Sequence, residues 1–266
     1  FESITGQINY EFKKPDTAGH FYLNLFGNHF GRGEINTYSA WKLGKKWSTM
    51  VFAHGNYFDK KVNLNDDNFL DIPMSQQLNI LNRWKYMGEN FMTQFGVNYI
   101  NEQKLGGQEL FNESTDKGTT NAYGFGVDTR RFTAFLKGGY IFDKPNTSLA
   151  LINSFQNHVQ KSYFGLNTFD ASQTSWYSNL IFQSIIGNTF HNYTVGASLV
   201  YDDYDQNLQQ DSSQVMFNRQ DVIPGVFIEY TYKPNDKFAL IAGLRDDYHN
   251  HFGNLFTPRL HLRYRL

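Results

Sequence analysis

Apolar and polar residues alternate with a period of two along most of this chain, and this pattern constrains the fold more than any other feature. Within 190–206, one face is apolar with a tyrosine at each end, and it comprises Tyr193, Val195, Ala197, Leu199 and Tyr201. Successive side chains of a β-strand point to opposite faces. Helical periodicity is hard to find in the sequence. The pattern therefore predicts an all-β protein.

The last segment indicates what its two faces contact. Leu260, Leu262 and Tyr264 share one face. The opposite face consists of His261, Arg263 and Arg265. Burying two arginines in a dry core would be costly, whereas a water-filled lumen accepts them. Lys137, in the alternating segment 132–142, is a further candidate for such a lumen.

Short turns alternate with longer polar stretches. Turn residues occupy 44–46, 88–90, 143–146, 187–189 and 233–236, and the longer polar stretches are 59–76, 105–122, 161–174 and 203–220. Outer-membrane barrels combine tight turns at one end with long loops at the other. We therefore predict a transmembrane antiparallel β-barrel. Tyr193 and Tyr201 would mark its two interfaces, and Asp202, Asp203 and Asp205 would lie in an outside loop. A strand of a large soluble β-sandwich is the alternative.

Composition narrows the functional classes. The 266 residues include 17 Tyr and 25 Phe, many for a soluble domain, although the mean hydropathy is only −0.53. The 24 basic and 25 acidic residues nearly balance, so bulk charge suggests no nucleic-acid partner. There is no cysteine and no run long enough for a membrane helix. Because common catalytic motifs are also missing, we do not expect an enzyme.

Several stretches resemble the TonB-dependent outer-membrane transporters, most closely the cobalamin-transporter branch. They include "FESITGQINYEFKKP" at the start, "NDDNFLDIP", and "LRDDYHNHFGNLFTPRLHLRYR" near the end. The resemblance implies that 1–15 is the C-terminal tail of a plug domain. It also implies that 16–266 is the N-terminal half of a 22-stranded transmembrane barrel, of which about 11–12 strands are present.

The same resemblance implies a function and its partners. The expected function is TonB-dependent uptake of a scarce nutrient, such as cobalamin, a metal chelate or a siderophore, in the bacterial outer membrane. The implied partners are outer-membrane lipid, the TonB complex through the plug, a small nutrient ligand and, as an open option, a surface lipoprotein. The chain ends on Leu266 rather than an aromatic residue, which departs from the usual barrel terminus. A complete small barrel of about twelve strands, acting as a passive pore or structural protein, is the alternative.

One polar loop is a candidate calcium site. In "KKVNLNDDNFLDIP", oxygen-bearing side chains recur at near-alternate positions, at Asn63, Asn65, Asp67 and Asp71. Ca²⁺ takes six to eight oxygen ligands in flexible geometry. The family's matching loop carries an acid where this chain has Asn65, which would weaken binding. The alternative is a solvated loop held by Asx turns.

Two further groups are candidate ligand contacts. Tyr163, Phe164 and Trp176 would cluster at one outside loop, where a ligand could stack on them. The alternative for these rings is an aromatic girdle at the membrane interface. Arg263 and Arg265 would contact ligand or plug in the lumen. His249 and His251 share a strand face and could hold a transition metal, although such a pair is usually polar surface.

Overall fold

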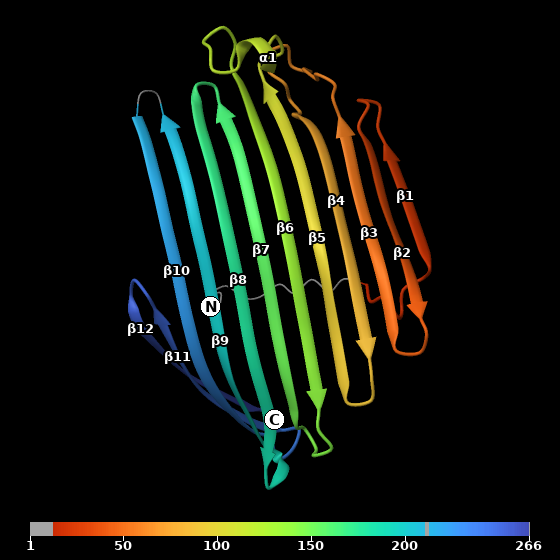
Figure 1. The fold of residues 1–266 in the computed structure, drawn as a ribbon, viewed down its shortest axis with the longest axis vertical. Helices are drawn as coiled ribbons and strands as arrows, with labels where there is room; N and C mark the ends of the chain where they lie inside the picture. The colour runs from red at the N-terminus through yellow and green to blue at the C-terminus, as the bar shows by residue number, and fades with distance from the viewer. Residues whose placement is uncertain (1–12, 211–212, 266) are drawn as a thin grey trace.

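The computed structural model describes residues 13–210 and 213–265, which form one antiparallel sheet. Every strand pairs with its neighbours in sequence, so the order runs from β1 to β12 without a crossover (Figure 1). The strands are β1 (Phe21–Gly27), β2 (Gly33–Leu43), β3 (Trp47–Phe58), β4 (Met74–Met87), β5 (Phe91–Gly107), β6 (Gly124–Ile141), β7 (Ser148–Phe164), β8 (Asn167–Ile186), β9 (Asn188–Gln210), β10 (Ser213–Tyr232), β11 (Phe238–His249) and β12 (Gly253–Tyr264). A single turn of helix, α1 (Glu113–Asp116), lies between β5 and β6. The predicted all-β antiparallel fold is confirmed.

One face of the sheet, which we call the outer face, is apolar. Directly paired residues share a face of a sheet, and one such row crosses eight strands: Phe91, Tyr140, Leu149, Phe182, Val195, Ile228, Leu244 and Pro258. Several of these side chains are more than a third exposed. Water would not favour such a continuous exposed surface, whereas lipid would.

The inner face, on the other side of the same strands, is polar. One row of directly paired residues on this face comprises Arg131, His158, Gln173, Tyr204 and Arg219. Residues 13–16 also lie against this face, because Arg83 and Lys85 of β4 contact them. The sheet curls, and β11 and β12 recede behind the other strands (Figure 1). The alternation in the sequence thus separates a lipid-compatible face from a water-compatible one.

Aromatic rings border the apolar band of the outer face at both ends. Near the short turns, Trp47 packs on Tyr86, Tyr140 on Phe142, and Phe182 on Tyr193. Towards the other end, Phe155, Trp176 and Tyr201 are direct partners on β7, β8 and β9. These rows are arranged as in the interfacial girdles of membrane barrels. Tyr193 and Tyr201 lie in opposite rows, as the sequence predicted.

All five predicted short turns connect strands in the structure. Gly44 and Gly187 have φ of 79° and 73°, in the left-handed region where glycine costs least. Asn146 has φ of 49° in another of these turns, and asparagine tolerates this region better than most residues. The short turns therefore follow from local sequence chemistry.

Two of the four predicted long loops consist mostly of strand residues in the structure, so these two predictions are wrong. Stretch 161–174 belongs mostly to β7 and β8, which are joined at a tight turn, and 203–220 belongs mostly to β9 and β10. Asp202, Asp203 and Asp205 consequently lie within β9, not in a loop. β9 has 23 residues, whereas about 9–11 residues cross the hydrocarbon. Beyond the membrane a strand needs no apolar face, so its polar sequence resembles that of a loop.

The sheet is open, and its twelve strands agree with the 11–12 strands expected in this chain. Within residues 13–210 and 213–265, β1 and β12 pair only with β2 and β11, so these residues do not form a closed barrel of twelve strands, and a 22-stranded barrel stays a prediction. The two edge strands are exposed along nearly their whole length. None of the helices in the described chain is long and apolar enough to cross a membrane.

Candidate functional site

The inner face carries a cavity of about 860 Å³ in the curve formed by β1 to β6. Its wall includes the cationic side chains of Lys14, Arg83 and Lys137. Aromatic rings and amides make up much of the remainder, from Tyr22, Tyr38, Phe52, Phe135, Asn79 and Asn98. Small-molecule sites are usually concave, with volumes of about 300–1,000 Å³ and a few placed polar groups. The cavity has these properties.

Hydrogen bonds between neighbouring strands hold the polar wall in place. Asn98 donates to Asn79 Oδ1 at 2.7 Å. His54 Nδ1 and Asn36 Oδ1 are also 2.7 Å apart. Arg83 donates to Gln94 Oε1 and to the carbonyl of Lys13. These bonds order the side chains before any ligand arrives.

Residues 13–16 form an anchor at the base of this wall. Pro15 is fully buried, and Lys85 Nζ lies 2.6 Å from Asp16 Oδ2. The Lys85 residue is only 7% exposed, and this carboxylate is the counter-ion of its ammonium group. Burial alone would raise the pKa of Asp16, but the hydrogen bond and charge of Lys85 outweigh burial, and the pKa is lowered. The anchor is thus a partly buried ion pair.

A second polar cluster lies on the inner face at β10 and β11. Asp221 is 4% exposed and accepts hydrogen bonds from Arg219 Nε to both carboxylate oxygens at 2.9 Å. The Nε2 atoms of His249 and His251 each lie 3.8 Å from Asp221 Oδ1. The structure therefore brings the two predicted histidines to one carboxylate, which already pairs with arginine.

Two long loops, 59–73 and 108–123, lie at the end of the sheet opposite the short turns, which we call the mouth. They contact each other directly. A β-bridge joins Phe69 to Gln108, and Glu109 N donates to Asn68 O. Lys61 Nζ donates to the carbonyls of Glu109 and Phe111. Figure 1 shows α1 at this end of the sheet, above β5 and β6. The two loops consequently form one unit.

The predicted calcium ligands all lie in this unit, where their side chains take part in hydrogen bonds. Asp67 accepts hydrogen bonds from the backbone N–H of Phe69 and from Asn65, and Asp71 accepts one from Leu64 N–H. Asn63 instead donates to Glu109 Oε2. Among the described residues, no group of three or more His, Cys, Asp or Glu side chains could hold a metal ion. Calcium binding stays a prediction from the sequence.

The three predicted ligand-binding aromatics are not brought together. Tyr163 is buried on the outer face, where its hydroxyl donates to Glu113 of α1. Burial raises the pKa of Tyr163, and the charge of Glu113 adds to the effect. Phe164 lies on the inner face and stacks on Phe125. Trp176, 47% exposed, belongs to the aromatic row of the outer face.

Arg263 and Arg265 lie at the open edge of the sheet. Arg263 is exposed on β12, on the face of Lys137 and opposite Leu262 and Tyr264. Arg265 follows the strand, and its N–H donates to Lys237 O. Figure 1 shows β12 at the receding edge of the sheet, whereas the residues that line the cavity are Lys14 and residues of β1 to β6. The two arginines are therefore not part of that cavity.

The sequence reasoning overlooked Arg83 and Lys85. They alternate with Trp84 and Tyr86 along β4, with cations on the inner face and aromatic rings on the outer face. This is the same signal that singled out Arg263 and Arg265. Period-two alternation could thus have identified both residues.

Comparison with known proteins identifies the fold. No family model and no curated protein matches the chain. Among solved structures, a mutant of the ferric enterobactin receptor PfeA from Pseudomonas aeruginosa matches with a TM-score of 0.63 and 12% identity. The match covers 92% of this chain and 41% of that one.

Two siderophore receptors from Acinetobacter baumannii match in the same way. PiuA has a TM-score of 0.63 and 11% identity, with 92% of this chain and 46% of that chain covered. PirA has a TM-score of 0.62 and 14% identity, with 92% and 40% covered. The chain therefore spans less than half the length of these receptors, and it has the fold of a part of them.

Proposed function

We propose that this chain is part of the barrel wall of a TonB-dependent outer-membrane receptor that takes up a siderophore or another metal chelate. The carrying observation is the match of nearly the whole sheet to siderophore receptors, at TM-scores above 0.6. The division into apolar outer and polar inner faces supports the same proposal, because a membrane barrel needs both. These neighbours are receptors rather than enzymes, which favours transport over catalysis.

The open edges support a role as part of a larger wall. In lipid, every backbone polar group must find a partner within the protein. The exposed edges of β1 and β12 would be satisfied by further strands of the same protein, as in a 22-stranded barrel. Residues 1–12, most of the proposed plug tail, lie outside the described residues. Lys13, Lys14 and Pro15 are at the inner face, where a tail running from a plug would enter the wall.

The remaining partners belong to the proposal and follow the resemblance. Outer-membrane lipid would contact the outer face, and the TonB complex would act through a plug. A surface lipoprotein could contact the loop unit at the mouth. Cobalamin is a secondary substrate candidate, because the comparison structures are siderophore receptors and only the sequence resemblance suggests it.

An uptake experiment tests the transport proposal. Cells that lack the gene for the whole protein, and cells that carry it, would be supplied with labelled ferric enterobactin or labelled cobalamin. We expect gene-dependent accumulation of one compound that is lost when TonB is deleted. Entry that persists without TonB would instead indicate a passive pore. Absence of gene-dependent uptake for chelates in general would overturn the proposal.

Calcium binding has a separate test. Titration calorimetry of the intact protein with Ca²⁺ should give heat that the Asp67→Ala variant reduces. Asp67 and Asp71 already accept hydrogen bonds from the backbone N–H groups of Phe69 and Leu64, so a cation would share these carboxylates with N–H donors. No heat, together with no effect of the variant, would rule out calcium at this loop.

A further inference from the structure

The charged side chains that line the cavity of β1 to β6 are all cationic. Lys14, Arg83 and Lys137 line it, and no Asp or Glu among the described residues does. The carboxylate of Asp16, which pairs with Lys85 in the anchor, is not part of the cavity lining. Cations gathered in a concave wall raise the local concentration of anions. The electrostatics of the cavity therefore favour a negatively charged ligand.

Lys137 is the cation best placed to meet a ligand. It lies on β6 opposite Gln94, and within the described chain its ammonium group has no hydrogen bond or ion pair. The other two cations already contact protein groups, and Arg83 is held by Gln94 and by the carbonyl of Lys13. Lys137 can thus bind an anion without breaking an existing contact.

Aromatic rings enclose the same space from two sides. Tyr22 and Tyr38 stack with ring centroids 5.4 Å apart, and Phe52 continues that surface at 5.8 Å from Tyr38. Phe135 lies on the other side, two residues before Lys137 on the same strand. Lys13 Nζ lies 5.5 Å from the ring centroid of Tyr22 and 4.8 Å from that of Tyr38, so a cation already contacts the two tyrosine rings. Together with Phe52 and Phe135, these rings give the cavity an aromatic wall against which a planar group can pack.

We propose that this cavity binds a small organic anion that carries an aromatic ring, with Lys137 contacting its charge and the tyrosine and phenylalanine rings its apolar face. The inference rests on the proposed transport function and deepens it, since it adds a binding site along the inner wall for an aromatic anionic substrate. The hydrogen-bonded amides of Asn79 and Asn98 supply a preformed polar floor.

A small anion fits the cavity better than an acidic polypeptide does. The volume of about 860 Å³ lies within the range of small-molecule sites. The described polypeptide that borders the cavity, residues 13–16, adds the cation Lys14 to the lining and not a carboxylate. The neighbouring chain therefore increases the positive charge that a ligand must balance.

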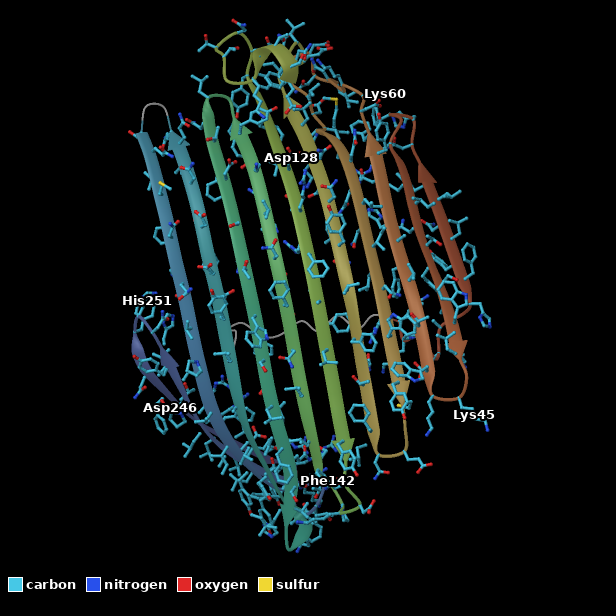
Figure 2. All side chains as sticks on the ribbon, in the orientation of Figure 1. Lys45, Lys60, Asp128, Phe142, Asp246 and His251 are labelled. Carbon is cyan, nitrogen blue, oxygen red and sulfur yellow. The ribbon has the colours of Figure 1, made fainter. Side chains whose placement is uncertain are left out.

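Benzoate is a suitable probe, because it combines one ring with one carboxylate. Its affinity for the intact detergent-solubilised protein would be measured by calorimetry, beside benzamide, which lacks the charge, and acetate, which lacks the ring. We expect benzoate to bind and both controls to bind at least tenfold more weakly. Lys137→Gln should weaken benzoate binding about tenfold or more, the usual effect of losing a charge-assisted hydrogen bond. Lys45→Gln, at an exposed turn away from the cavity (Figure 2), should have no effect.

A second variant keeps the test decisive if Lys137→Gln folds poorly. Gln94→Glu retains the acceptor for Arg83 and places a carboxylate in the lining, so it should abolish benzoate binding and leave the melting temperature unchanged or higher. Benzoate binding that neither variant alters would overturn the proposal. So would a lowered melting temperature in Lys137→Gln without any benzoate binding, which would show that an acidic segment of the protein occupies the cavity.

Failure of this site and failure of the transport proposal are distinguishable. Uptake of a chelate that depends on TonB, without benzoate binding, would overturn only the cavity proposal. Benzoate binding that depends on Lys137, without TonB-dependent uptake, would support the site and contradict the transport function.

Discussion

At the scale of single residues, close packing on the inner face depends on glycines that make room for aromatic rings. A Cβ added at Gly196 would lie 2.4 Å from Phe227 Cζ and 2.6 Å from the carbonyl oxygen of Leu180. The ring has some freedom to move, but the backbone carbonyl of the neighbouring strand has little. Similar contacts occur between Gly96 and Phe135. These glycines therefore hold neighbouring strands at a fixed approach.

Gly196→Ala should lower the free energy of unfolding by about 1–3 kcal/mol, the usual cost of overpacking. Denaturant unfolding of the intact protein in detergent would measure it. Gly139→Ala is the matched control, because it lies on the inner face of another central strand and its nearest atoms are 3.8 Å away. Equal destabilisation by both substitutions would contradict the packing role of Gly196.

The anchor should respond to acid. A carboxyl whose folded-state pKa is lowered contributes stability above its ordinary value, here 3.8, and that stability is lost as the pH falls through the lowered value. Hydrogen exchange of the Thr17 and Ala18 amides, which donate to Lys14 O, should therefore accelerate at acid pH beyond the intrinsic effect.

Asp16→Asn should remove this acid dependence and destabilise the anchor at neutral pH by about 1–3 kcal/mol, because Lys85 loses its partner while buried. Asp236→Asn is the control, since Asp236 pairs with Lys233 at an exposed turn. Unchanged exchange at Thr17 and Ala18 in Asp16→Asn would show that the ion pair does not hold the segment.

At this scale the sequence predicted which residue types matter better than where they meet. The inner-face position of Lys137 follows from alternation, as does that of Arg263. The separation of Tyr163, Phe164 and Trp176 could not be foreseen, because adjacent strand residues face opposite sides and 161–174 was assigned to a loop. The contact between residues 13–16 and β4 joins segments about 70 residues apart, which no local pattern reveals.

At the scale of elements, the proposed membrane placement divides the long strands into a membrane portion and an extension beyond it. The alternation of apolar residues predicts the first portion well, because lipid requires an apolar face. It fails for the second, where β7 to β10 continue in polar sequence as paired hairpins. Backbone hydrogen bonds in these extensions form regardless of side-chain polarity.

Leu180 tests the lipid-facing assignment of β8. Leu180→Arg should destabilise the folded protein in bilayers by about 2–4 kcal/mol, the cost of a cation on the lipid face near the bilayer centre. Asn179→Arg, one residue away on the inner face, should cost much less. Reversible unfolding of the intact protein from lipid vesicles would compare them. A larger loss for Asn179→Arg would reverse the assignment of the two faces.

Tyr163 tests the attachment of the mouth loop to the sheet. Its hydroxyl donates to Glu113 of α1, and Lys117 lies 4.5 Å from its ring centroid. Tyr163→Phe should weaken this attachment by about 0.5–1.5 kcal/mol, the net value of one hydrogen bond. Hydrogen exchange in 113–117 should increase while β7 stays protected. Tyr177→Phe is a control for loss of a hydroxyl elsewhere, and no change in 113–117 for Tyr163→Phe would refute the attachment.

At the scale of the whole molecule, this sheet can serve the proposed transport function only as part of a larger wall. Its twelve strands and their sequential order could be predicted from the sequence, because each hairpin is local. Closure could not, since it depends on strands that would pair with β1 and β12. The similarity to siderophore receptors over 92% of this chain, but less than half of theirs, agrees with this account.

The most direct test of the central claim is a cysteine scan of β9 from Tyr193 to Tyr201 in the intact protein within lipid vesicles. This chain contributes no cysteine, and any cysteine elsewhere in the intact protein would first be replaced by serine, so that each single substitution carries one fluorescent label. A quencher attached to lipid chains should quench labels at Val195, Ala197 and Leu199 strongly and those at Thr194, Ser198 and Val200 weakly. Quenching without a period of two, or strongest at the second set, would contradict a membrane wall whose outer face contacts lipid.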